Sequence, residues 1–131
     1  MTGVILIVED HADTATALER LLSRCGHRVT IAESGEAAVA IFDAAAEGGE
    51  PVPQVVILDM GLPRMDGIDV LRELRARRPL ARVPVIVYTA DFSQHRMRHA
   101  QTLGAREYLV KGTTSWEALT DAVQRCLNDA A

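Results

Sequence analysis

The stretch VVILDMGLPRMDG, residues 55–67, places a strand-length apolar run directly before an acidic residue and a loop that contains Gly and Pro. Residues 55–58 are all apolar and do not alternate with polar residues, which is typical of a parallel strand covered on both faces. Asp59 ends the run. The stretch therefore indicates a buried strand that holds a carboxylate at the edge of a sheet, where α/β proteins place their ligand sites.

Four further apolar runs of strand length occur in the chain, and segments with helical periodicity separate them. The five predicted strands are residues 4–8, 28–32, 55–58, 83–88 and 107–110. Alternating strands and helices with short connections predict a single α/β domain over residues 1–131. We expect a doubly wound parallel sheet with right-handed crossovers and helices on both faces.

The helical segments carry start and stop signals. We expect Asp13 to cap the first helix and Gly26 to end it, with Cys25 on its buried face. The later helices are predicted to begin at Ser34, Asp66, Ser93 and the capping box Thr114–Glu117. Ile41 in the second helix and Trp116 in the fifth are expected to be buried, and the arginines of residues 72–82 to be solvated.

Composition and charge exclude several classes of protein. The chain has 48% hydrophobic and 24% charged residues and a net charge of −4, which gives no electrostatic basis for direct nucleic-acid or anionic-membrane binding. The N-terminal run lacks the features of a signal peptide or membrane span, so we expect a cytoplasmic protein. Cys25 and Cys126 form no metal-ligand spacing and are expected to be free thiols.

Polar residues follow the predicted strands at their carboxyl ends. They are Glu9, Asp10, Asp59, Thr89 and Lys111. These ends form one edge of an open parallel sheet, so we expect the side chains to meet there. Crowded carboxylates repel one another unless a cation is bound, and Mg²⁺ prefers oxygen ligands. The sequence therefore predicts a magnesium site at this edge.

The same group of residues suits phosphoryl transfer. Lys111 supplies a positive charge and Thr89 a hydroxyl donor for phosphoryl oxygens. Asp59 is then the candidate nucleophile, because a carboxylate can accept a phosphoryl group as a mixed anhydride. Gly61 and Gly67 would let the following backbone pass close to the phosphate.

Four segments in this order, ILIVED, LDMGLPRMDG, VYTA and GAREYLVKG, make the chain resemble the receiver domains of two-component response regulators over essentially its whole length. The resemblance implies a flavodoxin-like three-layer fold with strand order 2-1-3-4-5. It implies Mg²⁺-dependent phosphorylation of Asp59 by a histidine kinase or phosphotransfer protein. The metal would be held by Asp10, by Glu9 through water, by Asp59 and by the backbone carbonyl of Met60.

The resemblance also implies a switch. Thr89 would move toward the phosphoryl group and Tyr108 would turn inward, which would remodel the face of helix 4, strand 5 and helix 5 for a downstream target protein. Tyr108 as a simple core aromatic is the alternative. Since the chain stops soon after the last helix, we expect a stand-alone regulator that catalyses only its own phosphoryl acceptance and dephosphorylation. A second copy of the chain is a further candidate partner.

Three positions affect this interpretation. Gly112 follows Lys111 where receivers usually carry Pro, and a cis bond to a non-proline residue costs about 2.5–4 kcal/mol, so we expect a trans bond and a differently shaped loop. A pseudo-receiver that binds partners without phosphorylation is therefore the alternative. Gly61 and Asp91, each two residues after a site residue, are hypothesised to leave water access to the phosphoryl group and to set its lifetime.

Other functions lack their motifs. A phosphatase with an aspartate nucleophile needs a second acid at the position of Gly61, and no GxGxxG or GxSxG is present. His95 and His99, four residues apart, would make half a metal site, but a solvated helix face is the simpler interpretation.

Overall fold

The computed structural model describes residues 2–130, with side chains up to residue 129. Five strands form one sheet in the order β2-β1-β3-β4-β5, and each neighbouring pair is parallel. The strands are β1 (Val4–Val8), β2 (Arg28–Ala32), β3 (Val55–Leu58), β4 (Val85–Thr89) and β5 (Glu107–Val110). The predicted fold class and strand order are confirmed. β4 begins two residues later than predicted because Val83 N closes a turn on Leu80 O.

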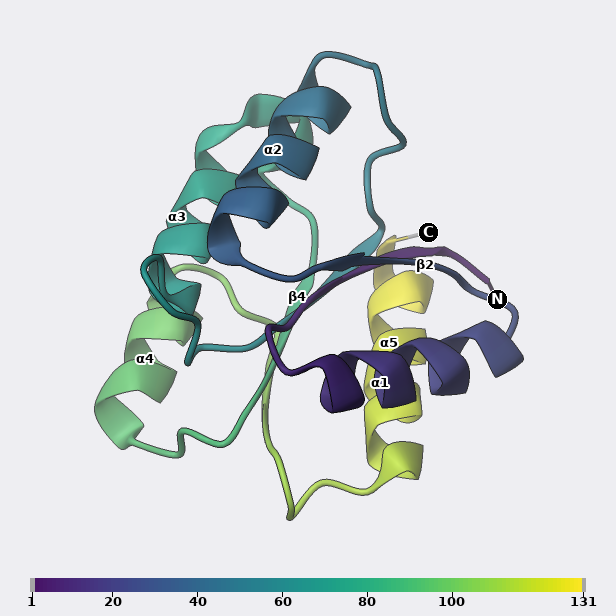
Figure 1. Cartoon of the computed structure of the whole chain (residues 1–131), viewed down its shortest axis with the longest axis vertical. Coiled ribbons are helices and arrows are strands. Elements are labelled where there is room, and N and C mark those ends of the chain that lie inside the picture. Colours follow the sequence, from purple (N-terminus) through teal and green to yellow (C-terminus); the bar gives the residue numbers. More distant parts are fainter. Residues whose placement is uncertain (1, 131) are drawn as a thin grey trace.

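Helices cover both faces of the sheet. They are α1 (Ala12–Arg24), α2 (Gly35–Ala46), α3 (Gly67–Ala76), α4 (Gln94–Thr102) and α5 (Trp116–Ala130), with a 3-10 turn η1 (Arg78–Leu80) after α3. Figure 1 shows α2, α3 and α4 on one side of the strands and α1 and α5 on the other. The molecule is thus a three-layer sandwich, as the resemblance implied.

Each face of the sheet has its own apolar core, which explains the unbroken apolar runs in the inner strands β1 and β3. Leu6, Val56 and Val85 point toward α2 and α3, where Phe42 is fully buried. The alternate strand residues point toward α1 and α5. In α2 the fully buried large residue is Phe42, whereas Ile41, predicted to be buried, is only half-buried.

The residues that begin and end α1 agree only in part with the prediction. Its N-cap is His11 rather than the predicted Asp13, which lies in the first turn, where a negative charge favours the helix dipole. At the other end, Gly26 has φ +91° and donates from N to Ser23 O. This Gly-terminated end confirms the predicted stop. Cys25 is exposed, contrary to prediction, because the helix has already ended.

Two predictions for α5 need correction. Trp116 is 46% exposed, because at the first helical residue its side chain lies beside α1 rather than in the core. The side chain that accepts from the first turn of the helix is Ser115 Oγ, bonded to Ala118 N at 3.0 Å, rather than that of Thr114. Cys126 is buried as predicted and is a free thiol, like Cys25.

The predicted solvation of the arginines is wrong for two of them. Arg75 is half-buried and donates to four backbone carbonyls, including Val83 O at 2.6 Å and Leu103 O at 3.0 Å. It thereby joins α3 to the segments before β4 and after α4. Arg77 is also mostly covered and pairs with Asp43 and Glu73.

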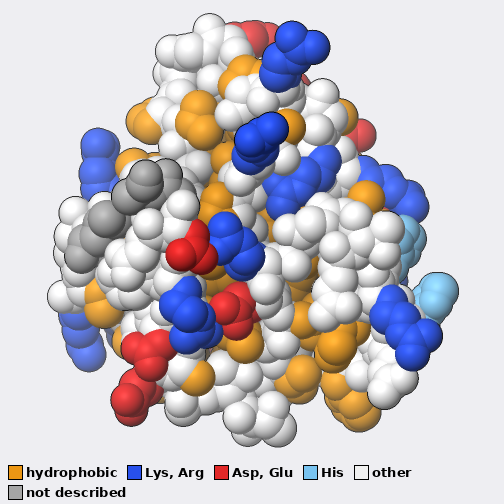
Figure 2. Space-filling model, turned by 180° about the vertical axis from the view of Figure 1, so that it is seen from behind, with side chains coloured by type: hydrophobic (Ala, Val, Ile, Leu, Met, Phe, Trp, Pro, Cys, Tyr) orange, Lys and Arg blue, Asp and Glu red, His pale blue; other side chains and the backbone are white. Residues whose placement is uncertain are grey.

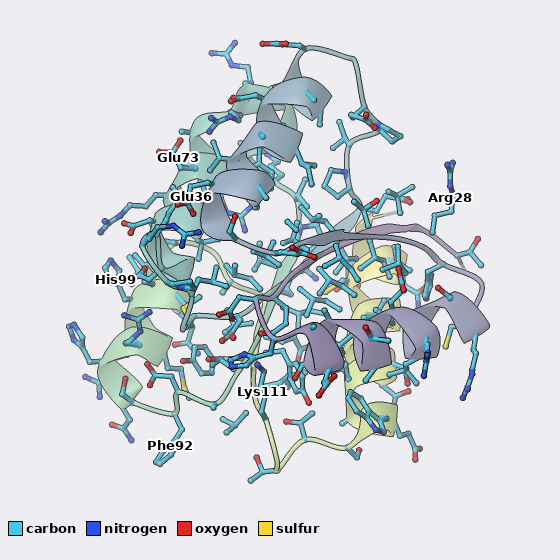
Figure 3. The ribbon with its side chains drawn as sticks, viewed as in Figure 1. Arg28, Glu36, Glu73, Phe92, His99 and Lys111 are labelled. Atoms are coloured by element: carbon cyan, nitrogen blue, oxygen red, sulfur yellow. The ribbon has the colours of Figure 1, made fainter. Side chains whose placement is uncertain are left out.

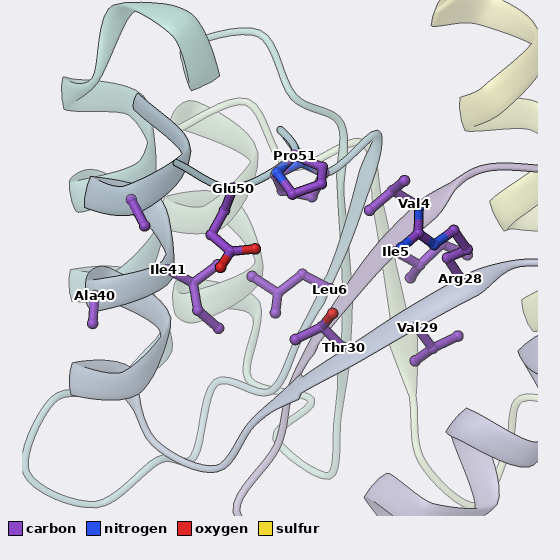
Figure 4. Close-up of a pocket in the computed structure, with 12 residues that line it drawn as sticks. Val4, Ile5, Leu6, Arg28, Val29, Thr30, Ala40, Ile41, Glu50 and Pro51 are labelled. Carbon is purple, nitrogen blue, oxygen red and sulfur yellow. The ribbon is translucent and has the colours of Figure 1, made fainter. Parts of the chain in front are cut away.

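A cavity of about 410 Å³ lies between α2 and the sheet (Figure 4). Its strand residues are 4–6 of β1 and 28–30 of β2, which belong to the starts of these strands. The predicted site residues follow the strand ends, so this cavity is separate from them. Within residues 2–130, no helix has the length and apolar composition needed to cross a membrane.

Candidate functional site

The strand ends bring the predicted site residues together at one edge of the sheet. β1 ends directly before Glu9, β3 ends directly before Asp59, and Thr89 is the last residue of β4. Backbone bonds continue the sheet past the strand ends, from Glu9 N to Ala32 O and from Asp59 N to Val8 O. The acids are therefore held by the sheet itself rather than by mobile loops, which favours a fixed site geometry.

Asp59 is the centre of the site. The residue is only 4% exposed, yet both carboxylate oxygens have partners. Oδ1 accepts from Thr89 Oγ1 at 2.7 Å and from Gly61 N at 3.1 Å. Oδ2 accepts from Lys111 Nζ at 3.2 Å. The acid therefore contacts the hydroxyl donor and the cation that the sequence predicted for it.

Glu9 is the second buried acid and shares Lys111 with Asp59. It is 2% exposed, and its Oε1 lies 2.6 Å from Lys111 Nζ. Its Oε2 accepts from His11 N at 3.2 Å and lies 3.1 Å from His11 Nδ1. Figure 3 shows Lys111 at this edge of the molecule. One ammonium group thus bridges two carboxylates from different strands.

Burial and charge shift the pKa values of these groups in different directions. Burial raises the pKa of Glu9 above its ordinary value, although Lys111 opposes this. Burial also acts to raise the pKa of Asp59, but hydrogen bonds from Thr89 and Gly61 N and the charge of Lys111 outweigh it, so that pKa is lowered. Burial acts to lower the pKa of Lys111, but Glu9 and Asp59 outweigh it and the pKa is raised. Asp59 is therefore held ionised beside a charged lysine.

The acids also form a group that suits a metal ion. Among the described residues, one ligand atom each from Glu9, Asp10, His11 and Asp59 lie within 4.8 Å of one another. Asp10 Oδ1 is shielded from solvent and accepts no hydrogen bond, although His11 Nδ1 lies 3.4 Å from it. A shielded carboxylate oxygen that accepts no hydrogen bond is costly unless a cation or water fills the gap. The carboxylate donors fit a hard cation such as Mg²⁺.

The Met60 carbonyl, which was predicted as a metal ligand, is engaged elsewhere. It accepts from Gly67 N at 3.0 Å and from Arg96 Nη2 at 3.1 Å. A carbonyl oxygen has two lone pairs, so one of these bonds would have to break before this oxygen could bind a metal. Met60 as a ligand stays a prediction. The sequence analysis did not identify Arg96 as a site residue, because no sequence pattern connects it with Met60, which lies far from it along the chain.

Glycines shape the loops around Asp59 and Lys111. A Cβ on Gly67 would lie 2.6 Å from Met60 Cα, so the start of α3 packs directly against the loop after Asp59. No cis peptide bond occurs among the described residues, so the bond before Gly112 is trans, as predicted, and Gly112 has φ +86°. Lys111 nevertheless reaches Glu9 and Asp59. The departure from Pro therefore does not displace the lysine from the site.

Thr89 is connected to Asp91, and Asp91 to Tyr108, by hydrogen bonds. The Tyr108 hydroxyl donates to Asp91 O at 2.7 Å, and the ring is half-buried against the core beside α3. Asp91 N lies 3.3 Å from Thr89 Oγ1. The Asp91 carboxylate is committed to α4, because Oδ1 accepts from Ser93 N at 2.9 Å and Oδ2 lies 3.1 Å from Arg96 Nε.

Among the described residues, the group of potential metal ligands around Asp59 does not include the two histidines of α4. The rings of His95 and His99 are 6.4 Å apart, and His99 lies 3.0 Å from the Arg72 guanidinium. A neighbouring guanidinium disfavours a metal at His99, which agrees with the solvated-face interpretation. Asp66 caps α3 as predicted, accepting from Ile68 N at 2.8 Å.

Comparison with known proteins gives a consistent result. The family model of the response regulator receiver domain matches residues 5–124. The sensory transduction protein RegX3 of Mycobacterium tuberculosis is 40% identical over 119 residues, which cover 91% of this chain and 48% of RegX3. The probable methanogenesis regulatory protein FilR2 of Methanothrix harundinacea is 32% identical over 123 residues, covering 92% of this chain and 79% of FilR2. The chain thus spans only about half of RegX3 but most of FilR2.

Solved structures agree with the sequence comparison. The receiver domain of the sensor histidine kinase PA1611 from Pseudomonas aeruginosa matches with a TM-score of 0.83 and 30% identity, covering 98% of this chain and 99% of that one. That structure is described as having a magnesium ion coordinated in the active site cleft. The chemotaxis protein CheY4 of Vibrio cholerae, at 24% identity and a TM-score of 0.84, shares the fold.

Proposed function

The chain belongs to the response regulator receiver domain family, a phosphoryl-accepting component of two-component phosphorelays, and from this premise we propose that Asp59 is the acceptor. The observation that supports this assignment is the environment of Asp59. One oxygen of this buried carboxylate accepts a hydrogen bond from Thr89 and the other accepts one from Lys111, and the acids Glu9 and Asp10 lie beside it.

The proposed reaction is an in-line transfer. An oxygen of Asp59 attacks the phosphorus of a phosphohistidine on a kinase or phosphotransfer protein, the O–P bond forms as the P–N bond breaks, and the imidazole leaves with its electron pair. Lys111 and Thr89 would then turn from Asp59 to the phosphoryl oxygens, supplying a charge and a hydroxyl donor. Water later hydrolyses the mixed anhydride. The chain would catalyse only these changes to itself.

Magnesium is part of the proposal. Asp10 and Asp59 would hold it directly and Glu9 through water, and Asp10 Oδ1, which accepts no hydrogen bond, supports this arrangement. When bound, Mg²⁺ would neutralise charge on the carboxylates and phosphoryl oxygens. Lys111 already offsets part of the repulsion between Glu9 and Asp59, so the acids tolerate one another before a metal binds.

The output is proposed to be a changed surface of α4, β5 and α5. Tyr108 in β5 is bonded to the loop that carries Asp91, and this loop begins at Thr89, so movement of Thr89 would reach the surface through it. The α4 sequence QHRMRHAQT contains no acidic residue. Figure 2 shows His and Arg side chains gathered at the edge of the molecule where α4 lies. A target protein with acidic character would fit this helix.

The partners follow from this function. In this proposal a histidine kinase or phosphotransfer protein donates the phosphoryl group, and a target protein docks on the phosphorylated chain. Phosphoryl transfer and docking would both take place in the cytoplasm. A second copy of the chain is an alternative occupant of the same α4-β5-α5 surface. Neither the phosphoryl transfer nor the docking of the target requires contact with nucleic acid or membrane.

Intact mass after incubation with acetyl phosphate tests the acceptor directly. We expect a Mg²⁺-dependent gain of one phosphoryl group in the wild type and no gain in Asp59→Asn. Asp66→Asn is the matched control, because Asp66 lies in the same loop but caps α3. Equal modification of wild type and Asp59→Asn would refute Asp59 as the acceptor. No modification under any condition would favour the pseudo-receiver.

A further inference from the structure

Arg96 lies where helix energetics disfavour it. It belongs to the first turn of α4, three residues after the N-cap Ser93, and this turn has no acidic residue. A positive charge near a helix N-terminus opposes the helix dipole and destabilises the helix. The Arg96 side chain is nevertheless held in place and only 28% exposed. Its contacts outside the helix, rather than the helix itself, account for this position.

The Arg96 guanidinium contacts three separate segments. Nε forms an ion pair with Asp91 Oδ2 in the loop before α4, at 3.1 Å and without hydrogen-bond geometry. Nη1 lies 3.5 Å from Asp66 Oδ2 at the cap of α3, and Nη2 donates to Met60 O at 3.1 Å. Met60 directly follows the proposed acceptor. The planar donor group of arginine suits simultaneous contacts of this kind, whereas lysine offers a single point charge.

These contacts close a ring around the acceptor. Asp59 bonds to Thr89, Thr89 Oγ1 accepts from Asp91 N, the Asp91 carboxylate pairs with Arg96, and Arg96 bonds to the Met60 carbonyl. Asp91 is therefore attached to the site through its backbone while its charge is directed to α4. Among the described residues, the Ser93 N–H is the other partner of that carboxylate and would hold it without Arg96.

We propose that Arg96 is a positioning residue for the phosphoryl transfer at Asp59, and that it acts by holding the Asp91 carboxylate away from the acceptor. The inference rests on the proposed function of Asp59. A phosphoryl donor brings negative charge to a site that already contains three acids, so a fourth carboxylate facing it would raise the barrier to transfer. Arg96 keeps that charge bound at the start of α4.

A double-mutant cycle on the full chain tests this mechanism. The rate of phosphorylation by acetyl phosphate at saturating Mg²⁺ is measured by intact mass for wild type, Arg96→Ala, Asp91→Ala and the double variant. We expect Arg96→Ala to slow transfer by about three- to tenfold, a coupling typical of contacting residues. In the Asp91→Ala background, loss of Arg96 should change the rate by less than about twofold. Arg98→Ala, an exposed arginine of the same helix, controls for charge.

A crystal structure of Arg96→Ala provides the second readout, which does not depend on phosphorylation. The inference predicts that the Asp91 carboxylate turns toward Asp59. It is overturned if Asp91 keeps its contact with Ser93 N, or if Arg96→Ala slows transfer equally with and without Asp91, since the effect would then come from α4 or Met60. Failure of the wild type to accept a phosphoryl group would refute the proposed function instead, and the position of Asp91 would still decide the inference.

Discussion

Asp59 and Glu9 are both buried carboxyl groups, yet their surroundings shift the two pKa values in opposite directions. Hydrogen bonds from Thr89 and Gly61 N outweigh the burial of Asp59, whereas burial dominates at Glu9 even though Lys111 lies 2.6 Å away. Environments that separate the pKa values of two acids also separate their roles. Asp59 is kept ionised, as the proposed attack on phosphorus requires, and Glu9 holds the lysine and, in the proposed function, a metal-bound water.

A side chain at position 61 is expected to lengthen the lifetime of the phosphorylated protein. A Cβ there would lie 3.9 Å from Asp59 Oδ1, so Gly61→Asn places an amide beside the acceptor without a clash. Because the amide would obstruct the attacking water, we expect hydrolysis to slow several-fold, measured as decay of the phosphorylated mass after the donor is removed. Gly49→Asn, in the loop after α2, is the control. An unchanged decay rate in Gly61→Asn would show that water approaches from elsewhere.

His27 gives the protein a pH dependence unrelated to the site. It is buried, and its Nδ1 accepts from Gly3 N at 3.1 Å, so protonation of Nδ1 would oppose this bond. Burial lowers its pKa below the ordinary 6.5. The stability contributed by neutral His27 is therefore complete above about pH 6.5 and is lost as pH falls from there through the lower folded pKa.

His27→Gln keeps an acceptor for Gly3 N but cannot titrate. We expect its free energy of unfolding in urea to vary less than that of wild type as pH falls below 6.5. His95→Gln, exposed on α4, is the control and should follow the wild type. Parallel curves for His27→Gln and wild type would assign the pH dependence to other groups.

At the level of the elements, the strands were the most predictable part of the molecule and the helix surroundings the least. The inner strands β1, β3 and β4 are largely apolar on both faces, whereas the edge strands β2 and β5 also carry polar residues. The strand positions and carboxyl ends still followed from the sequence, and with them the convergence of Asp59, Thr89 and Lys111. The roles of Arg75 and Arg96 did not follow. Their partners are carbonyls and carboxylates from distant loops, and such contacts leave no periodic pattern in the sequence.

The loop between β5 and α5 is built around Gly112 and should not accept the proline that receivers usually carry there. Gly112 has φ +86°, whereas proline is restricted to about −65°. We expect Gly112→Pro to lower the free energy of unfolding by about 1–3 kcal/mol, because the backbone would be strained. Phosphorylation should also slow, because the adjacent Lys111 would be displaced.

Gly48→Pro is the matched control for this loop. Gly48 also has a positive φ, of +84°, but lies after α2. Both variants should lose stability in urea, and only Gly112→Pro should lose phosphorylation rate at equal fraction folded. If Gly112→Pro kept full activity and stability, the loop would be able to adopt the negative φ that proline requires at this position.

Across the whole molecule, the site joins the two halves of the fold. The core beside α2 and α3 and the core beside α1 and α5 are separated by the sheet, and Glu9, Asp59 and Lys111 extend from three of its strands. Tyr108 and Arg96 then connect this edge to α4 and the loop before it. A ligand bound at the edge therefore contacts segments from both halves, and its binding energy is linked to global unfolding.

Mg²⁺ is accordingly expected to stabilise the whole chain. Binding only to the folded state at 100 times the dissociation constant adds about 2.7 kcal/mol to the free energy of unfolding, and chelation should remove it. Urea unfolding with and without Mg²⁺ measures this difference. Asp10→Asn should lose most of the effect, because Asp10 Oδ1 is the shielded carboxylate oxygen that accepts no hydrogen bond, whereas Asp13→Asn, exposed in α1, should retain it. An equal Mg²⁺ response in Asp10→Asn and wild type would place the ion outside the acidic group, and the neutralisation of Glu9 and Asp59 would then depend on Lys111 alone.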